Sequence, residues 1–261
     1  TLATIAMGKR KYQKGFDPIP CGFRKLPAKD MDMVQEYCDK SVAAIIIEPI
    51  QGEGGIHLAE LEFMKELRLF CDRNDIVLIF DEIQCGIART GRWFAKDHYD
   101  VAPDVMTLAK GLGGGVPIGA ILSYEKVAEA IDYGDHGTTF GGNPLVCAAS
   151  LKVLEIIEEE QLMENAQEMG AWLRQQIAAL EEESIVEIRG MGLMIGVQFD
   201  FPTAPLMNKM FEKKIIVNAT ADNVLRLVPA LNVGKQELEI LMENLKASIA
   251  ELKNELIYQK T

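Results

Sequence analysis

The fold is decided by residues 76–83, IVLIFDEI, an apolar run that ends in two carboxylates, Asp81 and Glu82. Runs rich in β-branched residues and without polar alternation are typical of strands that are buried on both faces of a sheet. Two similar runs flank this one, residues 43–50 (AAIIIEPI) and 105–110 (VMTLAK). We therefore expect three buried strands in the first half of the chain.

The segment between the first two strands has the spacing of a helix. Leu, Met and Phe recur at close to helical intervals in residues 60–74, ELEFMKELRLFCDRN. The order strand, helix, strand predicts a parallel sheet. A fourth strand is expected at residues 118–122, and Ser123 after it is a candidate N-cap.

The second half of the chain has a different character. Asn143 and Pro144 predict the start of a long helical stretch that runs to about residue 183, and Gly170 is the expected interruption. After it we expect a strand pair, a helix, further strands and a final amphipathic helix, at residues 185–199, 204–214, 215–231 and 235–257. These patterns predict an α/β fold with a mostly parallel large domain, residues 1–151, and a smaller α+β domain, residues 152–261, which includes the linking helix.

The composition excludes several classes of protein. The 261 residues carry a formal charge of −12, from 39 acidic and 27 basic residues, so the surface repels nucleic acid and anionic membranes. The basic cluster of Lys9, Arg10, Lys11 and Lys14 is short, and we interpret it as a solvated turn. No apolar run approaches the roughly 20 residues of a membrane span, and residues 1–7 lack the pattern of a signal peptide.

The cysteines indicate a reducing compartment. Five are present, an odd number, and none stands in a CxxC spacing. Neither a zinc site nor a full disulfide framework is therefore indicated. We expect a cytoplasmic protein.

Polar residues follow the apolar runs, where ligands of α/β sheets collect. They are Glu48, Asp81 with Glu82 and Gln84, and Lys110. A lysine and a carboxylate at neighbouring strand ends suit a pyridine cofactor, because the amine forms a Schiff base with its aldehyde and the carboxylate holds the ring nitrogen protonated. A strand ending in Asp-Glu is also the pattern of a nucleotide hydrolase that binds magnesium, although no GxxxxGK[ST] motif occurs.

The context of Lys110 favours the pyridine cofactor. Glycines follow it at positions 111 and 113–115, where backbone can pass close to a ligand. Four segments resemble, in order and spacing, the class III aminotransferases, which depend on pyridoxal phosphate: EPIQGEGG (48–55), LIFDEIQCGIARTG (78–91), PDVMTLAKGLGGGVPIGA (103–120) and HGTTFGGNPL (136–145). Residues 1–23 and 223–233 are also similar to that class. The resemblance implies the fold type I of pyridoxal-phosphate-dependent transferases.

The resemblance also implies roles for single residues. Lys110 carries the cofactor and shuttles a proton, and Asp81 pairs with the pyridine nitrogen. Three further cofactor contacts are expected from Glu82, from Ile83 against the ring and from Gln84 near the phenolic oxygen.

The expected contacts to phosphate and substrate lie elsewhere in the sequence. Thr139 is expected to bind the cofactor phosphate across a dimer interface, with Thr138 beside the substrate. Glu53 and Arg226 match a pair that is proposed, in related ω-aminotransferases, to let one pocket accept first an ω-amine and then a dicarboxylate. No metal is expected.

The motifs most resemble the branch of the class that acts on N-acetylornithine. The resemblance implies transfer of the ω-amino group to 2-oxoglutarate in arginine biosynthesis, by a homodimer with the site at its interface. Ornithine, succinylornithine and 4-aminobutyrate remain alternative donors.

The match starts partway into the family pattern. The phosphate-binding loop, the ring-stacking aromatic residue and the arginine for the substrate α-carboxylate lie upstream in relatives. We therefore expect the 261 residues alone to bind cofactor poorly and to turn over slowly. An inactive fragment that serves as a dimerisation module remains the alternative.

Overall fold

The computed structural model describes residues 6, 8 and 10–258, which belong to two units that meet at residues 42 and 43. Residues 1–5, residue 7 and Lys9, for which a signal peptide and a basic turn were considered above, lie outside the described residues. The first unit contains two short helices, α2 (Arg10–Gln13) and α3 (Met31–Tyr37). Asp30 caps α3, because its side chain accepts a hydrogen bond from Met33 N at 3.0 Å.

The second unit contains the predicted parallel sheet. Its order is β1-β4-β5-β6, formed by β1 (Ala44–Ile47), β4 (Val77–Asp81), β5 (Val105–Leu108) and β6 (Ala120–Ser123). β1, β4 and β5 are parallel, whereas β6 runs antiparallel to β5. The predicted helix between the first two strands is α4 (Leu61–Asn74). The expectation of a mostly parallel sheet in an α/β fold is therefore confirmed.

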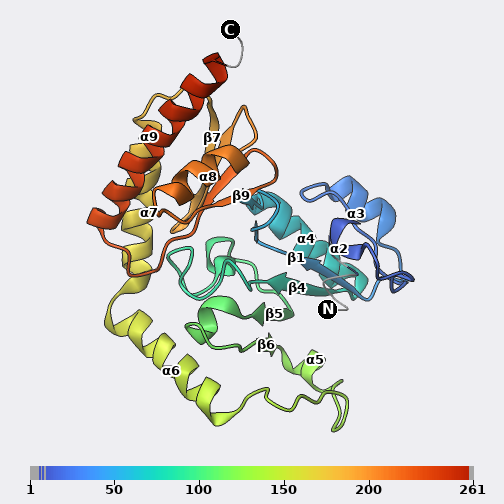
Figure 1. Ribbon diagram of the computed structural model, residues 1–261. Coiled ribbons are helices and arrows are strands. Elements are labelled where there is room, and N and C mark those ends of the chain that lie inside the picture. The colour runs from blue at the N-terminus through green and yellow to red at the C-terminus, as the bar shows by residue number, and fades with distance from the viewer. Residues whose placement is uncertain (1–5, 7, 9, 259–261) are drawn as a thin grey trace. The chain divides into compact units, whose positions relative to one another are not determined.

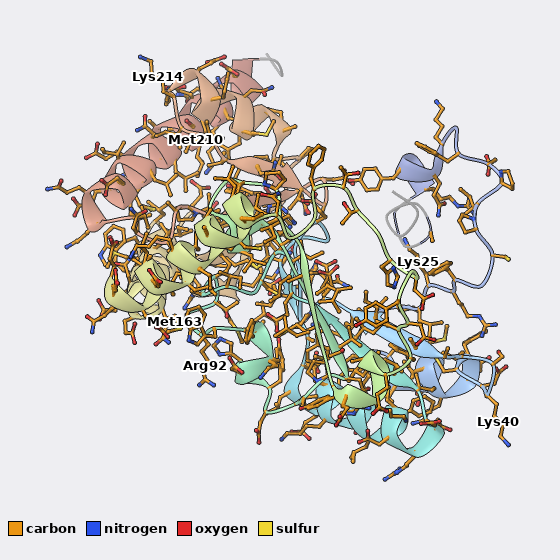
Figure 2. The ribbon with its side chains drawn as sticks, turned by 90° about the horizontal axis from the view of Figure 1, so that it is seen from below. Lys25, Lys40, Arg92, Met163, Met210 and Lys214 are labelled. Atoms are coloured by element: carbon orange, nitrogen blue, oxygen red, sulfur yellow. The ribbon has the colours of Figure 1, made fainter. Side chains whose placement is uncertain are left out.

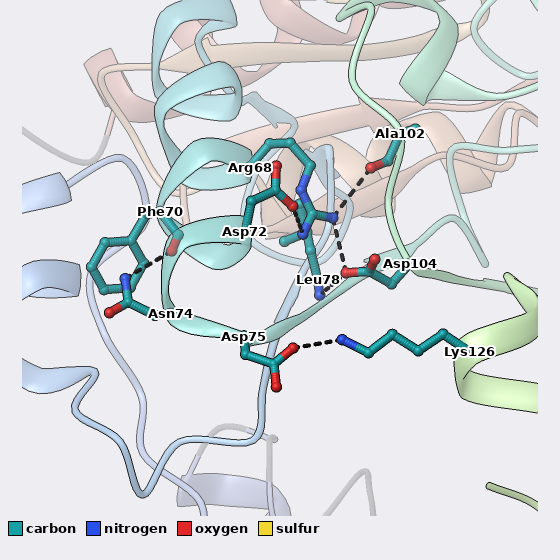
Figure 3. A network of polar contacts seen from close by, with 9 residues as sticks. All are labelled: Arg68, Phe70, Asp72, Asn74, Asp75, Leu78, Ala102, Asp104 and Lys126. Atoms are coloured by element: carbon teal, nitrogen blue, oxygen red, sulfur yellow. Dashed lines mark hydrogen bonds and ion pairs between the residues drawn. The ribbon is translucent and has the colours of Figure 1, made fainter.

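A polar network anchors α4 to the starts of two strands (Figure 3). Arg68 of α4 donates to Asp104 Oδ2 at 2.9 Å and to Ala102 O at 3.3 Å, and it forms an ion pair with Asp72 at 2.7 Å. Asp104 Oδ2 also accepts from Leu78 N at 2.7 Å. Since Leu78 lies in β4 and Asp104 directly precedes β5, the network holds these two strands in register.

Two local predictions differ from the structure. The single strand predicted at residues 43–50 is divided into β1 and the start of β2 (Ile50–Gln51), which forms an antiparallel hairpin with β3 (His57–Leu58). In the turn between them Ile56 has φ 58° and Gly55 has φ 106°. These left-handed conformations cannot be predicted from the spacing of apolar residues. Ser123 ends β6 and is not an N-cap, because the next helix, α5 (Glu125–Ala128), has Tyr124 at that position.

The long helical stretch is interrupted earlier than predicted. It forms α6 (Pro144–Glu159) and α7 (Leu162–Ala178), and the chain turns at Gln161, with φ 52°. The expected break at Gly170 is wrong. This glycine is buried within α7, where a Cβ would lie 2.0 Å from Gly192 O, so it permits close packing against the following sheet.

The second sheet is antiparallel and is covered by helices. Its order is β7-β8-β10-β9, formed by β7 (Ile185–Met191), β8 (Met194–Phe199), β10 (Val224–Leu227) and β9 (Asn218–Thr220). Helices α7, α8 (Ala204–Glu212) and α9 (Lys235–Tyr258) lie beside it, whereas α6 lies near the first sheet (Figure 1). This confirms the predicted series of strand pair, helix, strands and final helix.

The core of this second layer is apolar. It contains Leu173 of α7, Ile195 of β8, Leu225 of β10 and Leu245 of α9, all fully buried. Met210 of α8 belongs to the same core, whereas Lys214, just beyond α8, lies at the periphery (Figure 2). None of the described helices combines the length and the apolar character that crossing a membrane requires.

Candidate active site

The ends of β4 and β5 bring together the two residues on which the predicted chemistry depends. Asp81 is the last residue of β4 and pairs with Thr107 of β5, three residues before Lys110. Asp81 Oδ1 accepts from Ile83 N at 3.0 Å and from Thr107 Oγ1 at 3.5 Å. Because parallel strands end at the same edge of a sheet, the carboxylate and the lysine lie at one edge of this sheet.

Lys110 begins the 3-10 helix η2 (Lys110–Gly113) and is exposed. Its φ is 44°, in the left-handed region that residues with a Cβ rarely adopt. The glycines after it allow the turn to form. Gly114 has φ 57°, and a Cβ on it would lie 2.6 Å from Val153 Cγ2 of α6. Lys110 therefore stands in a tight turn directly after β5.

Glu48 connects this strand edge to the β2–β3 hairpin. Its Oε2 accepts from Gly52 N at 2.9 Å. Burial raises the pKa of Glu48, the Gly52 N–H lowers it, Asp81 raises it and Lys110 lowers it. The carboxylates and the lysine therefore share one electrostatic environment, in which Glu48 shapes the strand end.

Glu82 faces a different part of the fold. Its Oε2 accepts from Ala95 N at 2.6 Å and its Oε1 from Lys96 N at 2.7 Å, both at the start of η1 (Ala95–His98). The residue is buried, and this burial raises the pKa of its carboxyl, while the two N–H groups lower it. Both carboxylate oxygens of Glu82 thus stabilise the loop between β4 and β5.

The predicted pair Glu53 and Arg226 is formed. Arg226 Nη1 of β10 donates to Glu53 Oε1 at 2.6 Å across 173 positions of sequence, and also to Gln84 Oε1 at 3.1 Å. The side chain of Arg226 is 10% exposed and that of Glu53 is 56% exposed. Gln84 occupies the space that a side chain on Gly52 would need, since a Cβ there would lie 2.1 Å from its Oε1. The guanidinium is therefore a largely buried cation beside the strand edge.

The hairpin that carries Glu53 is held from the second sheet. Thr220 Oγ1 of β9 donates to Glu53 O at 2.7 Å, and Arg189 Nε of β7 donates to Gly55 O at 2.9 Å. A Cβ on Gly196 of β8 would lie 2.9 Å from Ile56 Cβ, so the sheets approach closely here. The Glu53–Arg226 pair is thus formed between the β2–β3 hairpin and the second sheet.

Thr138 and Thr139 lie apart from these residues. Both are exposed in the segment between α5 and α6, and within the described part of the chain no hydrogen bond joins either to Lys110 or Asp81. Their expected roles at a partner's site stay predictions.

Sequence reasoning missed Asn218, which accepts from Arg226 Nη2 at 3.0 Å. It lies directly opposite Arg226 in the antiparallel pair of β9 and β10. The available signal was TADN, residues 220–223, which contains two residues of positive φ, Ala221 and Asp222, and turns the chain. Had this turn been placed, positions 218 and 226 would have followed as a cross-strand pair.

Known proteins share both this sequence and this arrangement. Residues 1–249 match the Aminotransferase class-III family. The chain is 49% identical to the acetylornithine aminotransferase of Methanocaldococcus jannaschii over 97% of its length, and 43% identical to that of Nitrosomonas europaea over 95%. It spans 64% and 65% of the length of these two relatives.

Solved structures give the same result. An ornithine aminotransferase from Toxoplasma gondii superposes with a TM-score of 0.92 at 32% identity, over 98% of this chain and 63% of that one. An N-acetylornithine aminotransferase from Stenotrophomonas maltophilia superposes with a TM-score of 0.81 at 36% identity, over 89% and 63%. The motifs around Lys110 and Asp81 therefore stand in the fold that the resemblance implied, and the chain belongs to the class III aminotransferases.

Proposed function

We propose that this chain is the cofactor-bearing part of an aminotransferase that moves the ω-amino group of N-acetylornithine to 2-oxoglutarate in arginine biosynthesis. The observation that carries the proposal is the meeting of Lys110 and Asp81 at adjacent strand ends, next to the Arg226 guanidinium. Membership of the class III family argues against the alternative of a nucleotide hydrolase.

The residues at this edge fit pyridoxal phosphate, the cofactor of the class. They offer an exposed primary amine, a carboxylate and an amide, on Lys110, Asp81 and Gln84. When bound, the pyridinium ring withdraws electrons from the carbon that bears the amino group. The donor set thus matches the aldehyde, the ring nitrogen and the phenolic oxygen of that cofactor.

Each side chain has a distinct task in the proposal. The Lys110 amine binds the cofactor and moves the proton at the carbon that bears the amino group. Asp81 keeps the proton on the pyridine nitrogen, and Ile83 packs against the ring. Gln84 donates from Nε2 to the phenolic oxygen, since its Oε1 accepts from Arg226. We assign Glu82 to the support of η1 in place of a cofactor contact, because both its oxygens accept backbone N–H groups.

Selection of the substrates depends on the charges of Arg226 and Glu53. Arg226 binds a carboxylate of 2-oxoglutarate once Glu53 has turned aside, and Glu53 covers the guanidinium while the ω-amine donor is bound. Ornithine, succinylornithine and 4-aminobutyrate are the alternative donors, and the first is supported by the structural likeness to an ornithine aminotransferase. Comparing turnover of these four donors by the complete enzyme distinguishes them.

We propose that the enzyme is a homodimer in which Thr139 binds the phosphate in the partner's site and Thr138 lies beside the substrate. Large apolar side chains of residues 120–145, the stretch that contains these threonines, are exposed in the single chain: Ile121, Leu122, Tyr133, Phe140 and Leu145. Such a surface is typical of an interface. The division into residues 1–151 and 152–261, and a cytoplasmic location, belong to the same proposal. The location is supported by the five free cysteines.

The proposal is tested by fixing the cofactor to its lysine. The protein is saturated with pyridoxal phosphate and reduced with borohydride, and the modified peptide is mapped by mass spectrometry. We expect the label on Lys110 and its loss in Lys110→Ala. Lys126, which is exposed on α5, serves as the internal control for non-specific labelling. Equal labelling of Lys110 and Lys126 would contradict the assignment.

A further inference from the structure

Arg226 is held by acceptors from three segments of the chain. Glu53 Oε1 and Gln84 Oε1 both accept from Nη1, at 2.6 and 3.1 Å. Asn218 Oδ1 of β9 accepts from Nη2 at 3.0 Å. The two nitrogens of the fork are therefore bound differently, one by a carboxylate and an amide and the other by an amide.

The third nitrogen of the guanidinium does not contribute to its orientation. Arg226 Nε is buried and has no acceptor within the described part of the chain. Nη1 has two acceptors, whereas Nη2 has one, Asn218, within the described part of the chain. The hydrogen bond to Asn218 is therefore the contact that holds the Nη2 arm of the fork in place.

Asn218 itself is well placed for this task. It stands directly opposite Arg226 in the ladder, so both side chains project from the same face of the sheet. β9 is held at its other end by Thr220, which donates to Glu53 O at 2.7 Å. Because the Asn218 amide is neutral, it orients the guanidinium without cancelling its charge. A carboxylate in this position would compete with the substrate.

We infer that Asn218 is a positioning residue that keeps the Arg226 guanidinium directed into the pocket when Glu53 turns away, and that it thereby sets the preference for a dicarboxylate acceptor. The preference for a dicarboxylate rests on the proposed function, whereas the retention of Arg226 does not. Glu53 is the more exposed partner, and its backbone is anchored by Thr220, so rotation of its side chain alone opens the pair.

The experiment measures rotation of the Arg226 guanidinium about its Nε–Cζ bond by ¹⁵N NMR in the chain without cofactor. The signal is assigned as the one lost in Arg226→Lys. We expect slow rotation in the wild type and in Glu53→Ala, and rotation at least about tenfold faster in Asn218→Leu, which keeps the size but removes the acceptor. Asn218→Asp, which keeps the acceptor, restores slow rotation. Unchanged rotation in Asn218→Leu, or equally fast rotation in Glu53→Ala, overturns the inference.

A second measurement separates this inference from the proposed function. Glutarate is a five-carbon dicarboxylate without an oxo group, and its binding is followed by calorimetry. We expect tighter binding in Glu53→Ala and about tenfold weaker binding in Asn218→Leu. Asn74→Leu, a change at an exposed asparagine of α4, is the matched control and leaves binding unchanged. If the NMR result holds while the wild type does not bind glutarate, the role of Asn218 stands and the proposed acceptor is wrong.

Discussion

Lys110, the proposed cofactor-binding residue, has a backbone conformation that is unfavourable for a residue with a Cβ. A residue with a Cβ at φ 44° is disfavoured relative to glycine, and such departures cluster at functional sites. The tight turn into η2 accounts for the conformation, and the neighbouring glycines relieve crowding against α6. The lysine is thus retained at a position where the fold alone favours glycine.

This backbone conformation predicts a difference in stability between two Lys110 variants. We expect Lys110→Gly to be more stable than Lys110→Ala by about 1 kcal/mol, because only glycine adopts the left-handed region without strain. Urea unfolding followed by circular dichroism measures the difference, and both variants lose the borohydride-fixed label. An alanine variant as stable as the glycine variant would show that the turn carries no strain.

His98 gives the fold a pH dependence. Burial lowers the pKa of its imidazole from 6.5 and Arg92 lowers it further, whereas a backbone hydrogen bond with Thr90 and the charge of Asp97 raise it. A histidine with a lowered pKa binds fewer protons in the folded state than in the unfolded state, so its contribution to stability is lost as the pH falls below about 6.5. We expect the midpoint of urea unfolding to fall between pH 7 and 5, and to fall less steeply in His98→Asn. Equal slopes in the two proteins would exclude His98 as the cause.

At this scale the sequence predicts residues that end strands but not those that meet across them. Asp81 and Lys110 follow apolar runs and were found without the family resemblance. Asn218 was missed because its function depends on register, which a turn of non-glycine residues with positive φ establishes. Glu82 follows the same apolar run as Asp81, but its carboxylate accepts hydrogen bonds from the loop between β4 and β5. The two side chains differ because successive side chains of a strand point in opposite directions.

The spacing of apolar residues is sufficient to predict the longer helices and strands. Buried strands and amphipathic helices were predicted because their apolar patterns match their geometry, as for β4 and α4. The hairpin of β2 and β3 was missed because two-residue strands are too short to show a pattern. The helix break was placed at Gly170 on the basis of propensity, although close packing explains that glycine and Gln161 makes the turn.

Gly170→Ala tests this explanation. Glycine to alanine within an exposed helix is stabilising by about 1 kcal/mol. Here the new Cβ would lie 2.0 Å from the backbone oxygen of Gly192, so we expect a net loss of about 1 to 3 kcal/mol in the free energy of unfolding. Gly137→Ala, whose Cβ would meet nothing within 4 Å, is the control and is expected to be neutral. Stabilisation by Gly170→Ala would mean that α7 and the β7–β8 turn are not in tight contact.

At the scale of the whole molecule, the exposed apolar side chains near β6 predict self-association. Phe140 is 79% exposed, and Ile121 of β6 is 70% exposed. We expect sedimentation to give a mass above that of one 28.9 kDa chain, and Phe140→Asp to weaken the association by about tenfold or more. Phe211→Asp, at a 67% exposed position of α8, is the control. An effect of the same size from both variants would place the interface elsewhere.

The sequence alone predicted the fold class at this scale, because the order of strands and helices determines the layers. It did not predict that the second sheet would form hydrogen bonds with the β2–β3 hairpin. That contact joins Arg189 to Gly55 and Thr220 to Glu53, residues more than a hundred positions apart. Such pairings leave no local pattern in a single sequence.

The distance in sequence between Glu53 and Arg226 also has a consequence for biosynthesis. Arg226 is synthesised 116 residues after Lys110 (226 minus 110), which takes roughly 6 to 23 s at about 5–20 residues per second. In the proposed function, Lys110 is therefore synthesised before the residue that selects the acceptor, and a growing chain carries the reactive amine before it carries Arg226.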